Sequence, residues 1–375
     1  MDLKYKPDWE KAQDRFEAWW GSEMKGPLVQ IGCPAPSAPA IPRPVWRTGD
    51  DAWWWYMQWQ VAEADGKARG MNEFFEMWDA HLAGQRFLGD SFPLFWLNQG
   101  PGALAAYLTG HLKFMGNTTW FELAEPMPWR EIMKLKVEHD SPWFVRTIKA
   151  ARDAAARGKG RFVVGMSDLG GIHDILASLR TTEQLLEDCL NDPRAVLEAS
   201  MRLVPIWQAA FDELSEVIEY SGQYGSSAWM GLWAPGRWYP LQSDFAAMLS
   251  PAMFEELVLP VLVEQCQGLD HSIYHWDGPG QIPHLDMLLS IPELGGLQWV
   301  PGAGEKQNAD PKWQPLYERI QKAGKRLVMQ SVEAGEVVPL LKRLDSRGVL
   351  ITTWCGSERE GMELAEKVGA PAGLT

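Results

Sequence analysis

The chain has 375 residues, enough for one large domain or two of ordinary size, and no basic run offsets its formal net charge of −14. This acidic balance excludes nucleic acid and an anionic membrane surface as expected partners. Its first residues are charged, no apolar run has the length of a membrane span, and four cysteines are too few for a disulfide framework. We therefore expect a cytoplasmic protein.

Eight short apolar runs bounded by Gly, Pro, Asp or Asn predict β-strands. In chain order they are residues 27–33, 92–98, 161–167, 227–233, 271–277, 296–302, 326–332 and 348–354. Helical patterns lie between them, at 192–220 with a kink expected at Pro205, and at 250–268, 310–324, 335–348 and 357–369. This alternation predicts an α/β fold, a (β/α)8 TIM barrel forming a single domain over 1–375. Insertions at about 34–91 and 99–160 are expected to form a cap.

The fifth expected strand, HSIYHWD (271–277), raises the question of a metal site. Because side chains alternate along a strand, His275 and Asp277 share one face. Barrel enzymes carry their chemistry at the carboxyl ends of strands, and Cys355 ends the eighth strand. Nitrogen, oxygen and sulfur donors all suit zinc, so His275, Asp277 and Cys355 are the predicted metal ligands. A hydrogen-bonded His–Asp pair beside a buried cysteine is the alternative.

Other polar and aromatic residues at strand ends are candidates for the rest of an active site. Asp168 and Glu333 are the predicted acid–base residues, although Asp168 suits a helix N-cap equally well. Asp244 is better interpreted as an N-cap. Most of the 21 tryptophans suit a core, but some are expected to line a pocket. The predicted substrate-binding residues are Asn98, Trp233, Tyr274 and Trp299.

Three segments resemble the uroporphyrinogen decarboxylase-like superfamily: LQSDFAAMLSPAMFEELVLPVL, HSIYHWDGPGQIPHLDMLLSIPELGGLQWVPGAG and TTWCGSEREGMELAEKV. The resemblance covers roughly residues 160–370 and implies a (β/α)8 barrel. True decarboxylases carry an arginine-bearing motif that is missing from GCPAPSAPAIPRPVWR (32–47), so the chain is more similar to the cobalamin-dependent methyltransferase branch. In that branch His-x-Cys and a later Cys bind zinc, which activates a thiol. Asp277 stands where the first of those cysteines would be, and Cys355 where the later one would be.

The resemblance thus implies a zinc-dependent methyltransferase that acts on a small-molecule substrate. Methylcobalamin would arrive on a separate corrinoid protein, because no corrinoid-binding Asp-x-His-x-x-Gly is present. The alternative is a glycoside-active hydrolase or lyase, with a tryptophan-lined cleft and paired carboxylates such as Asp168 with Asp277 or Glu333. A non-catalytic binder of small molecules is a third possibility.

Overall fold

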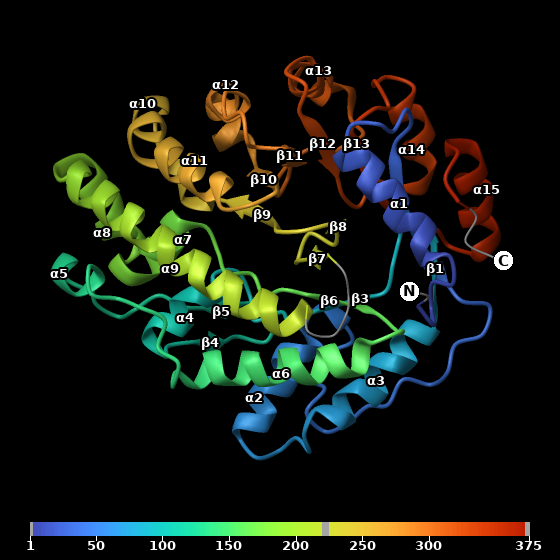
Figure 1. Cartoon of the computed structure of the whole chain (residues 1–375), viewed down its shortest axis with the longest axis horizontal. Helices are drawn as coiled ribbons and strands as arrows, with labels where there is room; N and C mark the ends of the chain where they lie inside the picture. Colours follow the sequence, from blue (N-terminus) through green and yellow to red (C-terminus); the bar gives the residue numbers. More distant parts are fainter. Residues whose placement is uncertain (1–2, 220–224, 372–375) are drawn as a thin grey trace.

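A computed structural model describes residues 3–219 and 225–371 and shows an α/β fold around a seven-stranded sheet (Figure 1). The sheet has the strand order β2–β1–β13–β12–β11–β10–β9, and every neighbouring pair is parallel except β1 with β2. Its strands are β1 (Leu28–Pro34), β2 (Gln85–Gly89), β9 (Trp238–Gln242), β10 (His271–Asp277), β11 (Gly296–Val300), β12 (Arg326–Met329) and β13 (Val349–Trp354). The predicted α/β class is confirmed.

Shorter strands lie outside this sheet. β3 (Leu94–Trp96) pairs in parallel with β6 (Val163–Gly165), while β4 (Lys113–Phe114) with β5 (Thr119–Trp120), and β7 (Ser226–Ser227) with β8 (Trp233–Ala234), are antiparallel. The expected strand at 227–233 is therefore a hairpin, in which Gly231 takes the left-handed conformation. The strand that joins the sheet beside β10 is β9, whose Pro240 is a residue typical of edge strands.

The two faces of the sheet have different coverings. We call the inner face the one that carries Leu28, Ile273, Val328 and Leu350, which pack with α1 (Trp9–Trp20) and with β8 in one apolar cluster. The outer face carries alternate residues such as Tyr274 and packs in a second, larger cluster with the surrounding helices. Every side chain on these strands is thus assigned to one face by period-two alternation.

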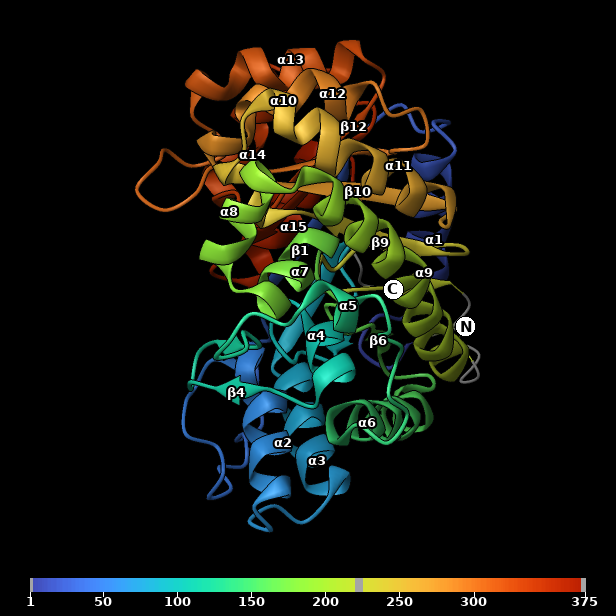
Figure 2. The same cartoon turned by 90° about the vertical axis from the view of Figure 1, so that its left-hand side faces the viewer.

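The helices surround the sheet, and Figure 2 shows α2, α3 and α6 gathered in a layer at the opposite end from α12 and α13. No described helix is both long and apolar enough to cross a membrane. The 27-residue α9 continues through Pro205. The helix bounds are α2 (Trp55–Ala64), α3 (Met71–Ala83), α4 (Ala103–Thr109), α5 (Trp129–Ile132), α6 (Pro142–Gly158), α7 (Ile172–Arg180), α8 (Thr182–Asn191), α9 (Pro193–Glu219), α10 (Pro251–Met253), α11 (Leu259–Gln267), α12 (Leu285–Leu289), α13 (Gln314–Lys322), α14 (Ala334–Leu341) and α15 (Glu358–Val368).

Candidate metal centre and tryptophan-walled cavity

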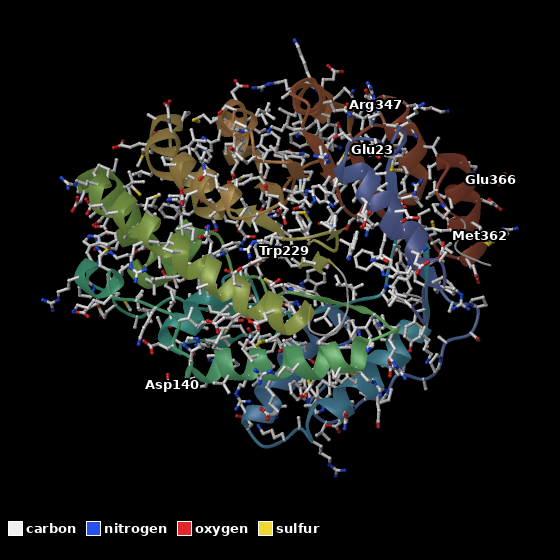
Figure 3. The ribbon with its side chains drawn as sticks, viewed as in Figure 1. Glu23, Asp140, Trp229, Arg347, Met362 and Glu366 are labelled. Carbon is white, nitrogen blue, oxygen red and sulfur yellow. The ribbon has the colours of Figure 1, made fainter. Side chains whose placement is uncertain are left out.

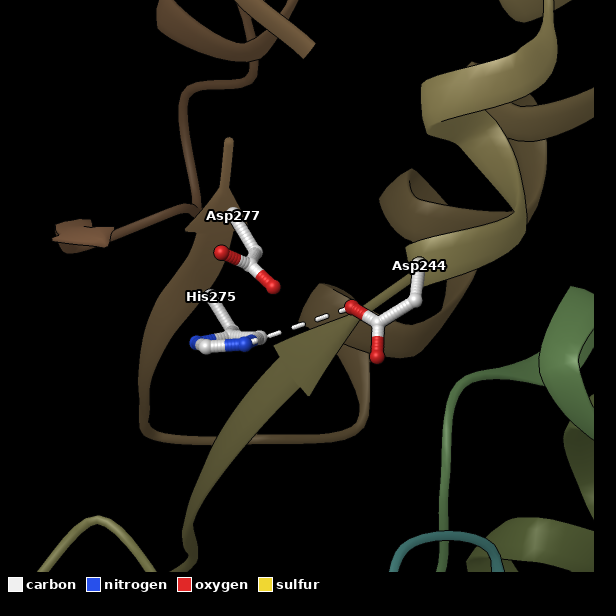
Figure 4. Close-up of side chains that lie close together, drawn as sticks. All are labelled: Asp244, His275 and Asp277. Carbon is white, nitrogen blue, oxygen red and sulfur yellow. Dashed lines mark ion pairs between the residues drawn. The ribbon is translucent and has the colours of Figure 1, made fainter. Parts of the chain in front are cut away.

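Three potential metal ligands meet at the carboxyl ends of β9 and β10. His275 and Asp277 both point from the inner face of β10, as the alternation in HSIYHWD predicts, and Asp244 reaches them from the 3-10 turn after β9 (Figure 4). One donor atom from each side chain lies within 4.8 Å of the others. His275 Nε2 and Asp244 Oδ1 are 4.0 Å apart. Imidazole nitrogen and carboxylate oxygen are both common ligands of divalent metals.

A chain of hydrogen bonds fixes which nitrogen of His275 faces this group. The Met230 carbonyl can only accept, so Gln330 donates to it through Nε2 at 2.8 Å. Gln330 Oε1 then accepts from Gln298 Nε2, which leaves Gln298 Oε1 to accept from His275 Nδ1 at 2.6 Å. The proton of neutral His275 therefore sits on Nδ1, and the Nε2 lone pair faces Asp244. Metal-binding histidines commonly have such a partner behind the ring.

The turn that carries Asp244 is held by a second aspartate. The Asp174 carboxylate, on α7, accepts hydrogen bonds from the backbone N–H groups of Asp244 at 3.1 Å and Phe245 at 2.7 Å. Gly171 at the start of α7 allows this approach, because a Cβ atom there would lie 2.2 Å from the Gln242 carbonyl oxygen and 2.4 Å from the Asp174 carboxylate. Asp174 thus positions Asp244 through the backbone.

The protonation of these groups reflects their crowding. Burial, and then the Asp277 carboxylate, raise the pKa of Asp244, although 51% of its side chain remains exposed. Burial and the Asp244 carboxylate raise the pKa of Asp174 as well. Burial lowers the pKa of His275 and keeps its imidazole neutral, the form that binds metals. Asp277 Oδ1 is buried without a hydrogen-bond partner.

A cavity of about 180 Å³ adjoins the group. Its walls combine strand ends with residues of the segment before α2 and of the turn after β7. They are Trp53, Trp54, Trp96, Asn98, Gly100, Pro101, Asp168, Trp229, Gln242, Asp244 and His275. Asn98 and Asp168, both predicted for the active site, thus line the same cavity as four of the tryptophans.

Asp168 is the buried carboxyl of this cavity. Its Oδ1 accepts from the Gly170 N–H at 2.9 Å, and the Tyr239 hydroxyl lies 3.5 Å away. Burial, followed by the charges of Asp244 and Asp174, raises the pKa of Asp168 to about 8. The group is therefore protonated at neutral pH and able to donate a proton to a molecule in the cavity.

The Asn98 side chain links the segment before α2 to the end of β3 through hydrogen bonds. Its Nδ2 donates to the Trp53 carbonyl at 2.6 Å, and its Oδ1 accepts from the Gly100 N–H at 2.8 Å. The rings of Trp53 and Trp96 meet with centroids 4.6 Å apart. Because both polar ends of its amide are engaged, Asn98 positions the tryptophan wall.

Comparison with solved structures finds a similar fold in a methyltransferase from Methanosarcina mazei. The TM-score is 0.54, the sequence identity is 13%, and the alignment covers 96% of this chain and 95% of that one. No protein-family model matches the sequence, and no curated protein does. The likeness is one of fold.

The structure does not bring Cys355 into the group of Asp244, His275 and Asp277. β13 ends at Trp354, and by alternation Cys355 follows Ile351 on the outer face, where it is buried among helix-packed residues. Burial of the thiol, and to a smaller extent the Glu360 carboxylate, raise the pKa of Cys355 to about 11. A thiol on the outer face cannot reach ligands on the inner face.

Other predicted residues also lie away from the cavity. Tyr274 is on the outer face, where its hydroxyl donates to Gln281 Oε1 at 2.8 Å. Trp299 packs in the same layer against Trp276 with ring centroids 4.4 Å apart, and Trp233 packs under α1, 5.8 Å from the ring of Trp9. Glu333 is exposed at the start of α14. Strand alternation turns Tyr274 and Trp299 away from the cavity, whereas Trp233 lies in the β7–β8 hairpin and packs in the inner-face cluster with α1.

Proposed function

We propose that this chain transfers a methyl group between a corrinoid and a small molecule, with a divalent metal ion held by Asp244, His275 and Asp277. The observation that carries the proposal is the meeting of three metal-binding atoms at the wall of a cavity. The resemblance to the methyltransferase branch, and the similar fold of a solved methyltransferase, support the choice of reaction.

The side-chain atoms of Asp244, His275 and Asp277 suit a metal ion. A buried carboxylate oxygen without a hydrogen-bond partner is costly unless a cation compensates it, and Asp277 Oδ1 is such an oxygen. His275 presents a lone pair to the same point. Zinc accepts this set of ligands and would keep an open position, but the absence of sulfur makes the set harder and suits Mn²⁺ and Fe²⁺ as well.

The chain's own residues would prepare the small molecule for transfer. A bound ion would act as a Lewis acid on a heteroatom of the substrate. Asp168 can hold or give a proton there, and the tryptophan walls limit the access of water. The methyl group would move as a methyl-cation equivalent from methylcob(III)alamin to a lone pair of the acceptor, and both electrons of the broken bond would stay on cobalt as cob(I)alamin. We expect the corrinoid to arrive on a separate protein.

We also propose that eight parallel strands, β1, β3, β6 and β9 to β13, close into a barrel. Such closure would gather their carboxyl ends at one mouth. The cavity supports it, since Asn98, Asp168, Asp244 and His275 follow or end four of these strands and line one space. An experimental structure in which β9 and the paired strands β1 and β2 stay apart from β3 and β6 would contradict closure.

The metal proposal is tested by titrating chelator-treated protein with Zn²⁺, Mn²⁺ and Co²⁺ in a calorimeter. We expect one ion per chain and at least a roughly 100-fold loss of affinity in Asp244→Asn, His275→Gln and Asp277→Asn, since each removes a ligand. Cys355→Ser and the surface variant Asp286→Asn should bind as the wild type does. Wild-type protein that binds no ion, or a loss confined to Cys355→Ser, would contradict the proposal.

The reaction is tested separately by anaerobic absorbance. Methylcobalamin incubated with the metal-loaded protein and a panel of thiols, phenols and amines should form cob(I)alamin with one acceptor class and not with His275→Gln. Absence of transfer to every class, with metal bound, would separate the metal site from this chemistry.

One observation favours a second function, cleavage of a glycoside. Asp168 is protonated at neutral pH and shares a tryptophan-walled cavity with Asp244, as the acid and the carboxylate of glycosidases do. Hydrolysis of nitrophenyl glycosides by the chelator-treated protein, lost in Asp168→Asn, would favour this function over methyl transfer.

A further inference from the structure

The cavity beside the candidate metal centre has an unusually aromatic wall. Trp53 and Trp54 come from the cap segment, Trp96 from β3 and Trp229 from the turn after β7. Trp229 meets His275 edge-on, with ring centroids 5.1 Å apart and planes at 89°. Figure 3 shows Trp229 near the middle of the molecule. Four indole rings from three segments thus line one space.

Every ionisable side chain of this wall except His275 is a carboxyl. Asp168 and Asp244 line the cavity, and its described lining residues include no lysine or arginine. Asp277 and Asp174 lie directly behind Asp244. An anionic ligand would meet these carboxylates without a compensating cation, whereas a cation would be attracted by both the carboxylates and the ring faces.

The polar groups of the wall suit a cation better than a sugar. Sugar hydroxyls need both donors and acceptors, but the Asn98 amide is engaged with Trp53 and Gly100. The indole nitrogens of Trp96 and Trp229 are buried, have no hydrogen-bond partner and expose almost no surface to a ligand. Besides the Gln242 amide and the His275 ring, what remains for a ligand is aromatic surface and carboxyl oxygen, the surroundings in which proteins bind quaternary ammonium groups.

The size of the cavity limits the ligand. With about 180 Å³, the cavity lies below the usual size range of drug-sized ligand sites, roughly 300–1,000 Å³. A small alkylated ammonium group fills such a space. A tetrapyrrole does not fit within it.

We propose that the cavity binds a small alkylammonium ion, held by Trp53, Trp96 and Trp229 and compensated by Asp244 and by the ionised form of Asp168. This inference rests on the proposed function, for which it names the substrate class. A tertiary amine would supply the accepting lone pair, and the product would be the quaternary ammonium ion. The bound ammonium form must first lose its proton to water; the freed lone pair then becomes the new N–CH₃ bond, and cob(I)alamin is the leaving group.

The test is calorimetric binding of choline and of its neutral isostere 3,3-dimethylbutan-1-ol to chelator-treated protein at a pH of about 8.5, where Asp168 is mostly ionised. We expect choline to bind at least about tenfold more tightly than the isostere. Trp53→Leu and Asp168→Asn should each weaken choline binding by at least about threefold. Trp53 is 51% exposed, so its substitution leaves the core intact.

Two control variants test whether a loss of choline binding comes from the cavity or from the removal of any tryptophan or any acidic side chain. Trp120→Leu removes a tryptophan that is 55% exposed on β5 and outside the cavity wall, and Asp286→Asn removes a surface charge. Both should bind choline as the wild type does. Equal binding of choline and its isostere, no choline binding at all, tighter binding of glucose, or unchanged binding in Trp53→Leu would each overturn the proposal. Because the measurement uses neither metal nor corrinoid, its failure leaves the tests of the proposed function standing.

Discussion

The Nδ1 atom of His275 on β10 lies 2.6 Å from the Oε1 atom of Gln298, its partner on the neighbouring strand β11. Since the other end of the Gln298 amide donates to Gln330, the Gln298 oxygen faces the imidazole and orients its Nε2 lone pair. The residue behind the ring therefore belongs to the candidate metal centre as much as the ligands in front of it do.

Replacing Gln298 by Met should keep the volume and remove the acceptor. We expect the affinity for the metal ion to fall by about 10- to 100-fold with one ion still bound per chain, as for other partners of metal-binding histidines. Calorimetric titration measures both quantities. Gln267→Met, on the exposed surface of α11, is the matched control, and equal affinities of the two variants would show that Gln298 does not act through His275.

Asp168→Asn should change how stability depends on pH. Because burial raises the pKa of Asp168 from 3.8 to about 8, the native state keeps a proton that the unfolded chain loses across this interval. The native state then binds more protons, so this group makes stability fall as pH rises between those values. The variant lacks this slope, so its free energy of unfolding relative to the wild type should increase from pH 5 to pH 8. Urea unfolding in chelator measures it, and a constant difference would contradict the assignment.

Gly171→Ala should displace the backbone that positions Asp244. The added Cβ would lie 2.2 Å from the Gln242 carbonyl oxygen and 2.4 Å from Asp174, so α7 or β9 must shift. We expect a destabilisation of about 3 kcal/mol or more and weaker metal binding, because Asp174 holds the turn of Asp244. Thermal unfolding and titration measure the two effects. At Gly26 a Cβ meets no atom within 4 Å, so Gly26→Ala should show neither.

Arg15→Met should lower the free energy of unfolding, because it leaves the buried Asp90 carboxylate without its cation. Asp90 is fully buried and accepts from Arg15 Nε at 2.5 Å and Nη2 at 3.1 Å, as well as from the Val29 N–H at 2.7 Å. Losing the guanidinium leaves that carboxylate poorly compensated, and we expect a loss of about 3–5 kcal/mol in the free energy of unfolding. Arg194→Met removes an exposed pair with Glu198, which water and salt screen, and should hardly change the free energy of unfolding. Denaturant titrations compare the two, and similar losses would contradict this account.

The sequence alone was enough to place His275 and Asp277 together, because strand alternation is a local rule and HSIYHWD follows it. The prediction extended the eighth strand by one residue, to Cys355, and so placed Cys355 beside His275 and Asp277. β13 ends at Trp354, and a shift of one residue moves a side chain to the other face. A single-residue uncertainty at a strand end therefore decides whether a residue is a ligand or part of the core.

Asp244 was missed for a different reason. LQSDFAAML has the pattern of an N-cap, and the strand before it, WYPLQ, contains Pro240. The signal that could have found it is Gln242, an inner-face residue paired with His275, with Asp244 two positions beyond. Trp53 and Trp229 could not be assigned to the cavity, since their place depends on how the cap segment and the hairpin fold over the strand ends.

The atoms that Asp244, His275 and Asp277 turn toward one another are oxygens and a nitrogen, while all four cysteines are buried and unpaired elsewhere. Peroxide converts exposed thiolates to sulfenic acids and higher oxides, but it does not attack carboxylates in this way. A centre built from these three side chains is therefore insensitive to the thiol redox balance of its surroundings. The oxygen donor at position 277 also gives the group less affinity for soft metal ions than a sulfur donor would.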